Sequence, residues 1–95
     1  MPSIVVGDRT YPCTGTVTIG RKASCDIVLE PGPGALLWVC AVHAAIVIDA
    51  TGAATFRDGS EDGSFVNDAL VTNRAVPLQS GDRIRIGRHE LVFLL

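Results

Sequence analysis

Short runs of apolar and β-branched residues alternate with Gly, Pro, Asp and Asn along the whole chain. The clearest alternation, Arg83-Ile84-Arg85-Ile86, places charged and apolar side chains on opposite faces of a strand. Ala44–Ile48 is almost wholly apolar, and its short length favours a buried strand over a helix. No apolar residues recur at helical spacing over a capped segment. The pattern predicts strands at 3–6, 9–12, 14–19, 26–29, 44–48, 53–57, 65–67, 69–71, 83–86 and 90–95.

Many short strands separated by turn residues are typical of an all-β sandwich. A chain of 95 residues has the length of one domain. The sequence contains no internal repeat, low-complexity tract or linker. We therefore predict a single all-β domain over residues 1–95.

The charge balance and hydropathy exclude several classes of partner. The net charge of −2 argues against nucleic-acid binding, because such surfaces are basic. The longest apolar stretch, Ala35–Val42, is well short of the ~20 residues that cross a bilayer, so no membrane insertion is expected. Met1-Pro2-Ser3 lacks the basic start of a signal peptide, which predicts a cytoplasmic location.

The cysteines and acidic residues do not form a recognisable reactive site. Cys13, Cys25 and Cys40 are an odd number without close spacing, which is a poor disulfide framework. No Cys-x-x-Cys pair accompanies His43, so we expect no metal site and no cofactor. No nucleophile has a visible base partner, and we predict that the chain is not an enzyme.

Four motifs follow one another in a fixed order. They are Gly20-Arg21 with Asp26-Ile27-Val28-Leu29, then Cys40–Ala44, then Gly59–Asp68, then Leu78–Gly87. From about Thr16 to Leu95 this order resembles the forkhead-associated (FHA) domain, and Leu78–Gly87 keeps that family's last motif whole. The resemblance implies an FHA-type antiparallel β-sandwich of about eleven short strands. It also implies that loops at one end bind phosphothreonine peptides.

The motifs depart from the family pattern where the phosphate binds. The resemblance places Cys40 at the phosphate-binding Ser and Ala41 at the following cation. Glu61 and Asp62 stand where the family has Thr and Asn, whereas Arg21 keeps its family type. The residues equivalent to the phosphopeptide pocket are Arg21, Lys22, Cys40, Ala41, Ser60, Glu61, Asp62 and Gly63.

These departures remove donors and add negative charge. A thiol is a weak donor, and two carboxylates repel a phosphate dianion. We expect Arg21 to pair with Glu61 or Asp62, and the resemblance implies that His43 braces a loop. The sequence thus predicts a degenerate, phospho-independent interaction module for a protein or peptide. The alternative is a noncanonical phosphothreonine reader that uses Arg21, Lys22 and the amides of residues 60–64.

The Glu30–Cys40 segment is longer than the family pattern requires and carries Leu36, Leu37 and Trp38. Trp is enriched at interface hot spots, so this segment is a candidate hydrophobic contact for a partner. The same residues could instead fold back as a lid on a small core. We expect the parent to be a bacterial signalling, scaffold or secretion protein.

Overall fold

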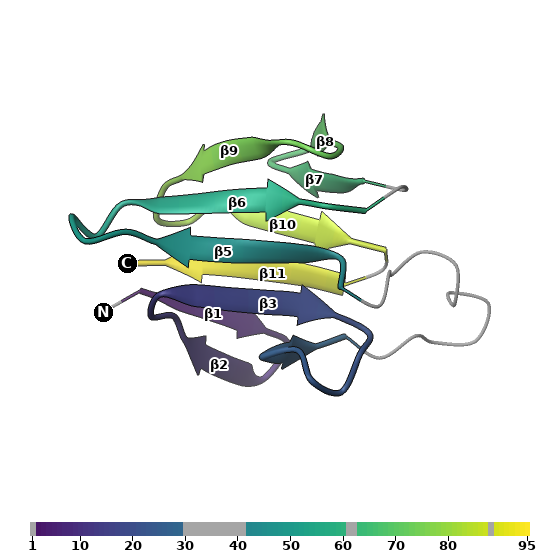
Figure 1. Ribbon diagram of the computed structural model, residues 1–95, viewed down its shortest axis with the longest axis horizontal. Coiled ribbons are helices and arrows are strands. Elements are labelled where there is room, and N and C mark those ends of the chain that lie inside the picture. The colour runs from purple at the N-terminus through teal and green to yellow at the C-terminus, as the bar shows by residue number, and fades with distance from the viewer. Residues whose placement is uncertain (1, 30–41, 61–62, 88) are drawn as a thin grey trace.

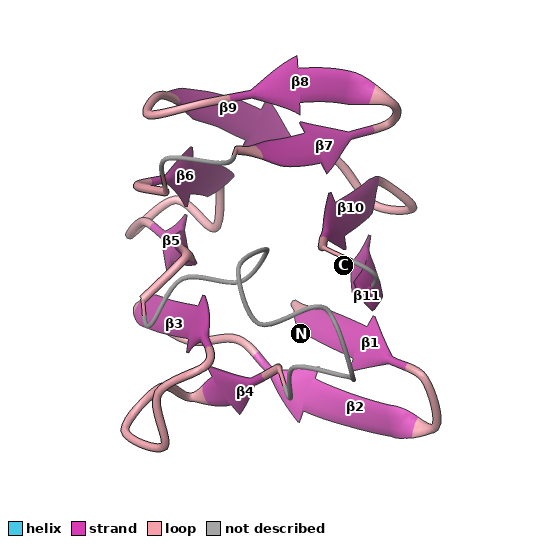
Figure 2. Ribbon diagram, turned by 90° about the vertical axis from the view of Figure 1, so that its right-hand side faces the viewer, coloured by secondary structure: helices cyan, strands magenta, loops and turns pink. Residues whose placement is uncertain are grey.

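The computed structural model describes residues 2–29, 42–60, 63–87 and 89–95, which form a β-sandwich of two facing sheets (Figures 1 and 2). The six-stranded sheet has the order β2 (Arg9–Pro12), β1 (Ser3–Val6), β11 (His89–Leu94), β10 (Arg83–Ile86), β7 (Ser64–Val66), β8 (Ala69–Val71). The five-stranded sheet has the order β4 (Ile27–Val28), β3 (Thr16–Gly20), β5 (Ala44–Ile48), β6 (Ala54–Asp58), β9 (Ala75–Leu78).

Strand alternation builds the core between the sheets. In β10, Ile84 and Ile86 are fully buried while Arg83 and Arg85 are exposed, as the period of two requires. Phe56 from the five-stranded sheet and Phe93 from the six-stranded sheet are the largest fully buried side chains. Their neighbours in the core include Ile4, Ile19, Ile27, Leu29, Ile46 and Leu91. Burying such side chains stabilises the fold by about 1.5–3 kcal/mol each.

Neither Cys13 nor Cys25 takes part in a disulfide within the described residues, and both are buried. Burial raises the pKa of the Cys13 thiol above its ordinary value. These two cysteines therefore pack as small apolar side chains, as the sequence predicts. Among the described residues there is no helix with the length and hydropathy to span a membrane.

The strands confirm the predicted all-β fold, and their number, eleven, matches the expected total. The predicted ten lie within about two residues of the observed bounds. The pattern missed β9, because Pro77 interrupts a very short apolar run. Since β9 is the last strand of its sheet, Pro77 is tolerated there. One pair, β3 with β4, is parallel, whereas the other pairs are antiparallel.

The sheet edges carry residues that limit further strand pairing. An unprotected edge strand is a template for aggregation. At the edge strand β8, the Arg74 Nη2 donates to the carbonyl oxygen of Leu70 at 3.2 Å. Pro77 on β9 and Pro12 on β2 remove donors from two other edges. Three of the four edge strands, β2, β8 and β9, thus carry residues that limit pairing with another chain.

The β7–β8 hairpin turns through Asn67 and Asp68, whose φ angles are 50° and 69°. Two consecutive positive φ angles define the type I′ turn that matches strand twist and favours Asn-Gly. Asn67 uses its side chain: its Oδ1 accepts from the Arg83 amide at 3.0 Å, and its Nδ2 donates to Asp82 at 2.9 Å. No such bond is found for the Asp68 side chain within the described residues.

We therefore expect Asp68→Gly to raise the free energy of unfolding by about 0.5–1 kcal/mol, because glycine adopts this backbone without strain. Urea unfolding measures the difference. Asn67→Gly is the matched control at the neighbouring position, and it should destabilise the domain because two side-chain hydrogen bonds are lost. Equal effects of the two substitutions would contradict this account of the turn.

The turn between β5 and β6 is closed by Asp49. Its Oδ1 accepts hydrogen bonds from Thr51 Oγ1 at 2.6 Å, Thr51 N at 2.9 Å and Ala53 N at 3.1 Å. The Thr51 hydroxyl is the largest cause of a lowered pKa for the Asp49 carboxyl, whose ordinary value is 3.8. The pKa of Asp49 is therefore lower in the folded state than in the unfolded state. The ionised carboxylate stabilises the fold fully at a pH above its unfolded-state pKa, and this stabilisation is lost as the pH falls through the folded-state pKa.

We therefore expect the stability difference between the wild type and Asp49→Asn to be constant near neutral pH and to shrink below about pH 4. Chemical unfolding at a series of pH values measures that difference, and NMR titration of Asp49 gives the pKa directly. A stability difference that grows as the pH falls would show that folding raises the pKa of Asp49 instead of lowering it.

Candidate functional site

Three loops meet at one end of the sandwich. They are the turn after β3, the residues before β5 and the connection from β6 to β7 (Figure 1). They bring together segments that lie about twenty residues apart in the sequence. Loops on a rigid β scaffold are common positions for binding residues. Of the eight residues equivalent to the phosphopeptide pocket, the described ones, Arg21, Lys22, Ser60 and Gly63, belong to these loops.

Asp58, the last residue of β6, joins these loops through a buried carboxylate with 4% exposure. Its Oδ1 accepts from the amides of Ser60 at 3.0 Å and Asn73 at 3.1 Å. Its Oδ2 accepts from the hydroxyls of Ser64 at 2.6 Å and Ser60 at 3.0 Å. A buried carboxylate is tolerated when donors surround it, so Asp58 ties the ends of β6, β7 and the β8–β9 loop together.

His43 is fully buried directly before β5. Its Nε2 donates to the carbonyl oxygen of Gly63 at 2.9 Å, which fixes the proton on that nitrogen. The same nitrogen lies 3.6 Å from Asp58 Oδ2. The backbone of His43 adds bonds in both directions, from its amide to the Ile19 carbonyl at 2.8 Å and from the Gly59 amide to its carbonyl at 3.1 Å. His43 thus contacts the ends of three strands or loops.

Ser60 and Gly63 point their polar groups inward. The Ser60 hydroxyl donates to Asp58 and accepts from the Gly63 amide at 2.8 Å. Ser60 has 4% exposure. Gly63 has a φ of 82°, and an added Cβ there would lie 2.6 Å from Thr72 Oγ1. The Ser60 hydroxyl and the Gly63 amide therefore already form hydrogen bonds within the fold.

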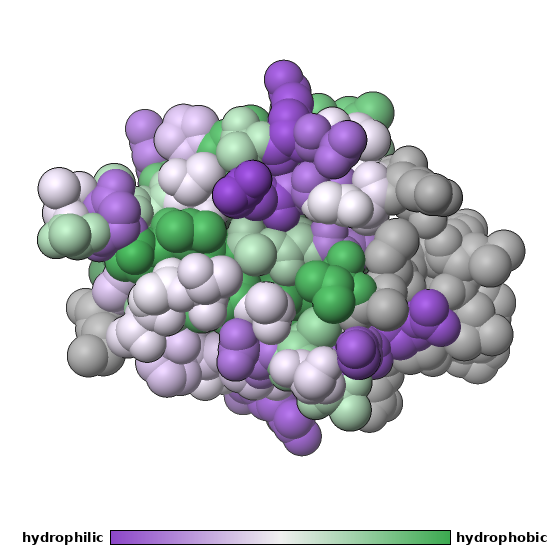
Figure 3. All heavy atoms as spheres, viewed as in Figure 1, coloured by the Kyte–Doolittle hydropathy of each residue, from purple (hydrophilic) through white to green (hydrophobic). Residues whose placement is uncertain are grey.

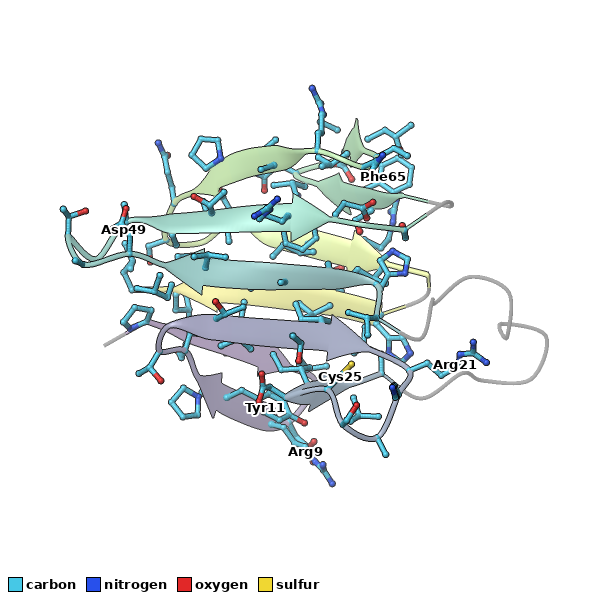
Figure 4. The ribbon with its side chains drawn as sticks, in the orientation of Figure 1. Arg9, Tyr11, Arg21, Cys25, Asp49 and Phe65 are labelled. Atoms are coloured by element: carbon cyan, nitrogen blue, oxygen red, sulfur yellow. The ribbon has the colours of Figure 1, made fainter. Side chains whose placement is uncertain are left out.

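Arg21 and Lys22 are exposed on the turn that follows β3, and Figure 4 shows Arg21 extending from the loop end of the molecule. The base of this turn is fixed. Asp26 Oδ2 accepts from the Thr18 amide at 2.9 Å, and the Asp26 amide donates to Thr18 Oγ1 at 3.0 Å. Within the described part of the chain, neither cation forms an ion pair. Two exposed cations thus project from a hydrogen-bonded turn.

A shallow pocket of about 370 Å³ lies beside the loops on the outer surface of the five-stranded sheet. Figure 3 shows apolar and weakly polar residues over β5 and β3 on this face. Arg57 is the exposed cation in the lining, while the polar groups of His43 and Asp58 face the interior hydrogen bonds. The remaining lining residues are Thr16, Val42, Ala44, Ala45, Val47, Gly59 and Asn73.

Several predicted site residues lie outside the described residues. They are Cys40, Ala41, Glu61 and Asp62 of the pocket, and Leu36, Leu37 and Trp38 of the apolar segment. The predicted pairing of Arg21 with Glu61 or Asp62 consequently stays a prediction. The described pocket residues Arg21, Lys22, Ser60 and Gly63 do lie on loops at the same end of the fold (Figure 1).

The sequence interpretation overlooked two residues of the hydrogen-bonded centre. Asp58 was not identified as a site residue, although an acidic residue at the end of an apolar strand, directly before Gly59-Ser60, could have indicated a local hydrogen-bond acceptor. Asn73 was not singled out, yet its φ of 51° and its amide bond to Asp58 position the β8–β9 loop. A positive φ at Asn is a recognisable but weak sequence signal.

An eleven-stranded sandwich with a braced loop end has the architecture of a loop-based binding module. A family model for the FHA domain matches residues 17–87. The chain therefore belongs to the FHA domain family. FHA domains are protein-interaction modules that bind phosphopeptides. No curated protein sequence matched the chain significantly.

Solved structures support the assignment over nearly the whole chain. The FhaA FHA domain, solved with the intracellular domain of Rv3910, is 28% identical with a TM-score of 0.82, over 98% of this chain and 99% of that one. Mycobacterium tuberculosis EmbR, solved with a low-affinity phosphopeptide, is 32% identical with a TM-score of 0.83, over 98% of this chain and 24% of EmbR. The N-terminal FHA domain of S. cerevisiae Rad53p shares the fold, with 19% identity, a TM-score of 0.85 and coverage of 99% and 92%.

Proposed function

We propose that this FHA domain is a non-catalytic protein-interaction module that has lost phosphothreonine recognition and binds its partner without phosphate. The observation that carries the proposal is the set of side chains at four pocket positions. Cys40, Ala41, Glu61 and Asp62 replace the serine, cation, threonine and asparagine of the family pattern. None of the four is a strong donor to an anion, and two are anions themselves.

The energetic cost of these replacements is large compared with ordinary peptide affinities. A like charge at about 4 Å costs on the order of 1–4 kcal/mol, depending on the local dielectric. Each lost hydrogen bond to a charged group costs about 1.5–3 kcal/mol. Since about 1.4 kcal/mol is tenfold in affinity, phosphate binding should be weaker by several decades.

The inward bonding of Ser60 and Gly63 supports the same proposal. The Ser60 amide and hydroxyl are bonded to Asp58, and the Gly63 amide is bonded to Ser60. These groups would have to leave partners within the fold before they could bind a phosphate. We propose that His43, through its bond to Gly63, holds this turn in place as a loop brace.

The alternative, a noncanonical phosphothreonine reader, is favoured by the exposure of Arg21 and Lys22. Calorimetric titration with matched phosphorylated and unphosphorylated peptide libraries separates the two functions. We expect phosphorylation to change the affinity by less than about tenfold. Micromolar binding that requires phosphate and is lost in Arg21→Ala would establish the alternative instead.

We propose that Leu36, Leu37 and Trp38 contribute the apolar contact that replaces phosphate recognition. Aromatic anchors carry much of the energy of protein interfaces. We expect the emission of Trp38, the single tryptophan, to be red-shifted and readily quenched by acrylamide in the free domain. A blue-shifted, shielded emission would show that the segment covers the core of its own domain.

The parent protein, we further propose, is a bacterial signalling or scaffolding protein of the cytoplasm. The likeness to Mycobacterium tuberculosis EmbR supports the bacterial setting. Cys13 and Cys25 are not in disulfides within the described residues, which fits a reducing compartment.

A further inference from the structure

The outer surface of the six-stranded sheet carries a continuous row of long side chains. The strand register places Glu90 opposite Arg85, Arg85 opposite Phe65, and Phe65 opposite Leu70. These four residues lie on four adjacent strands, β11, β10, β7 and β8. Directly opposed side chains on one face are neighbours, so the row is a single contact surface.

A second row lies two residues further along β10 and β11 and continues onto β1. Val5 of β1 is opposite Val92 of β11, which is opposite Arg83 of β10. The inward neighbours Ile4, Leu91 and Ile84 are fully buried, which orients Val5, Val92 and Arg83 outward. Figure 2 shows this sheet forming one wall of the sandwich, opposite the five-stranded sheet.

The two arginines of this face are available to a partner. Arg85 lies over the Phe65 ring, with the guanidinium carbon 4.7 Å from the ring centroid. Arg83 and Arg85 are both exposed, and neither forms an ion pair among residues 2–29, 42–60, 63–87 and 89–95. Residues two apart on a strand stand about 6.5–7 Å apart. The spacing matches alternate side chains of a second extended chain.

Apolar side chains flank these cations. Leu70 is 53% exposed at the edge of the sheet, next to the half-buried Phe65. Val5 and Val92 are half-buried on the other side of the arginines. We define the Arg83–Arg85 face as Val5, Phe65, Leu70, Arg83, Arg85, Glu90 and Val92. It holds two cations and one anion, whereas the whole chain has a net charge of −2.

We propose that the Arg83–Arg85 face binds an extended protein segment in which acidic residues alternate with apolar ones. Charge complementarity selects acidic side chains for Arg83 and Arg85, which are the two cations of the face. The apolar residues of the segment pack on Phe65, Leu70 and Val92. An arginine already stacked on an aromatic ring loses less conformational freedom when it binds a carboxylate.

Other occupants fit the face less well. A second copy of the chain would oppose two arginines with two arginines, and one Glu90 per copy compensates only part of that repulsion. Nucleic acid would meet just two phosphate-binding cations on a chain of net negative charge. Both occupants are tested by the experiment below.

The probe is a short synthetic peptide that alternates Asp with Leu and Tyr, titrated into the isotope-labelled domain. We expect amide shifts on β7, β10 and β11. Arg83→Glu combined with Arg85→Glu should weaken binding at least about tenfold. The matched control, Arg9→Glu with Arg57→Glu, makes the same change in net charge at two residues outside the face and should leave binding unchanged. If the charge reversal unfolds the domain, Arg83→Gln with Arg85→Gln gives the same comparison.

Each opposite result overturns the proposal. One such result is an absence of amide shifts at millimolar peptide, and another is amide shifts confined to the loop end. The proposal also fails if an all-Glu peptide binds as tightly as the alternating peptide, or if the control pair weakens binding as much as the substitutions at Arg83 and Arg85. Tighter binding of a single-stranded oligonucleotide would assign the face to nucleic acid. Concentration-dependent shifts of the same amides without peptide would assign it to a second copy of the chain.

Discussion

Replacing Asp58 by asparagine should lower the free energy of unfolding by about 3–5 kcal/mol, because the two hydroxyls that donate to one carboxylate oxygen would each lose an acceptor at a cost of about 1–3 kcal/mol. The carboxylate accepts hydrogen bonds from Ser60, Ser64 and Asn73. In asparagine an amide nitrogen replaces one carboxylate oxygen, and this nitrogen cannot accept the hydrogen bonds that the oxygen accepted. The donors left without an acceptor are buried, so each retains its desolvation cost. For a domain of this size, the melting temperature should fall by roughly 12 °C or more.

Thermal unfolding followed by far-UV circular dichroism measures this loss. Asp8→Asn is the matched control, because it makes the same chemical change at an exposed turn, and it should alter stability by less than about 0.5 kcal/mol. Ser64→Ala removes one of the donors and should have an intermediate effect. If Asp58→Asn and Asp8→Asn melt at the same temperature, Asp58 does not organise the loop end.

The sandwich was predictable because its strands repeat a strong local signal. Arg83–Ile86 alternates so clearly that its buried and exposed faces follow from the residues alone. Leu78–Gly87 adds a turn whose Asp82 bonds the Gln79 amide at 2.8 Å, a role expected of Asp at a turn. β9 escaped prediction because it is defined by pairing with β6 across the sheet and not by its own sequence.

The loop end was less predictable because its central bonds join residues far apart in the sequence. His43 and Gly63 are 20 residues apart, and Asp58 and Asn73 are 15 apart. Sequence spacing contains no direct signal for such bonds. The family resemblance supplied the position of His43, but it did not indicate that Asp58 would take the central place among the donors. The outer face of the six-stranded sheet likewise depends on register between strands distant in the chain.

The braced scaffold and the pocket side chains are separable properties of this domain. Gly63 accepts the bond from His43 through its backbone carbonyl, and the Ser60 hydroxyl is bonded within the turn. None of these bonds requires a particular side chain at position 61 or 62. Pocket residues can therefore change while the frame that supports them stays intact, which is the condition for restoring an ancestral pocket by substitution.

Restoring the family residues at the four altered positions should create phosphothreonine binding. The variant combines Cys40→Ser, Ala41→Arg, Glu61→Thr and Asp62→Asn. It removes two negative charges, adds one cation and replaces weak donors with strong ones. A gain of about 3–4 kcal/mol for a phosphothreonine peptide corresponds to an affinity increase of roughly two to three decades. Isothermal titration against the phosphorylated and unphosphorylated peptide measures the gain.

Two partial variants divide this gain between its causes. Glu61→Thr with Asp62→Asn tests repulsion, and Cys40→Ser with Ala41→Arg tests the missing donors. Asp49→Asn with Asp68→Asn removes the same two negative charges elsewhere, Asp49 being at the opposite end of the sandwich (Figure 4), and should leave phosphopeptide affinity unchanged. Adding Arg21→Ala to the full restoration should abolish the gain, because Arg21 is the cation of the family pattern that this chain has kept. A restored variant that still ignores phosphate would show that the loss lies in the loop backbone and not in these four side chains.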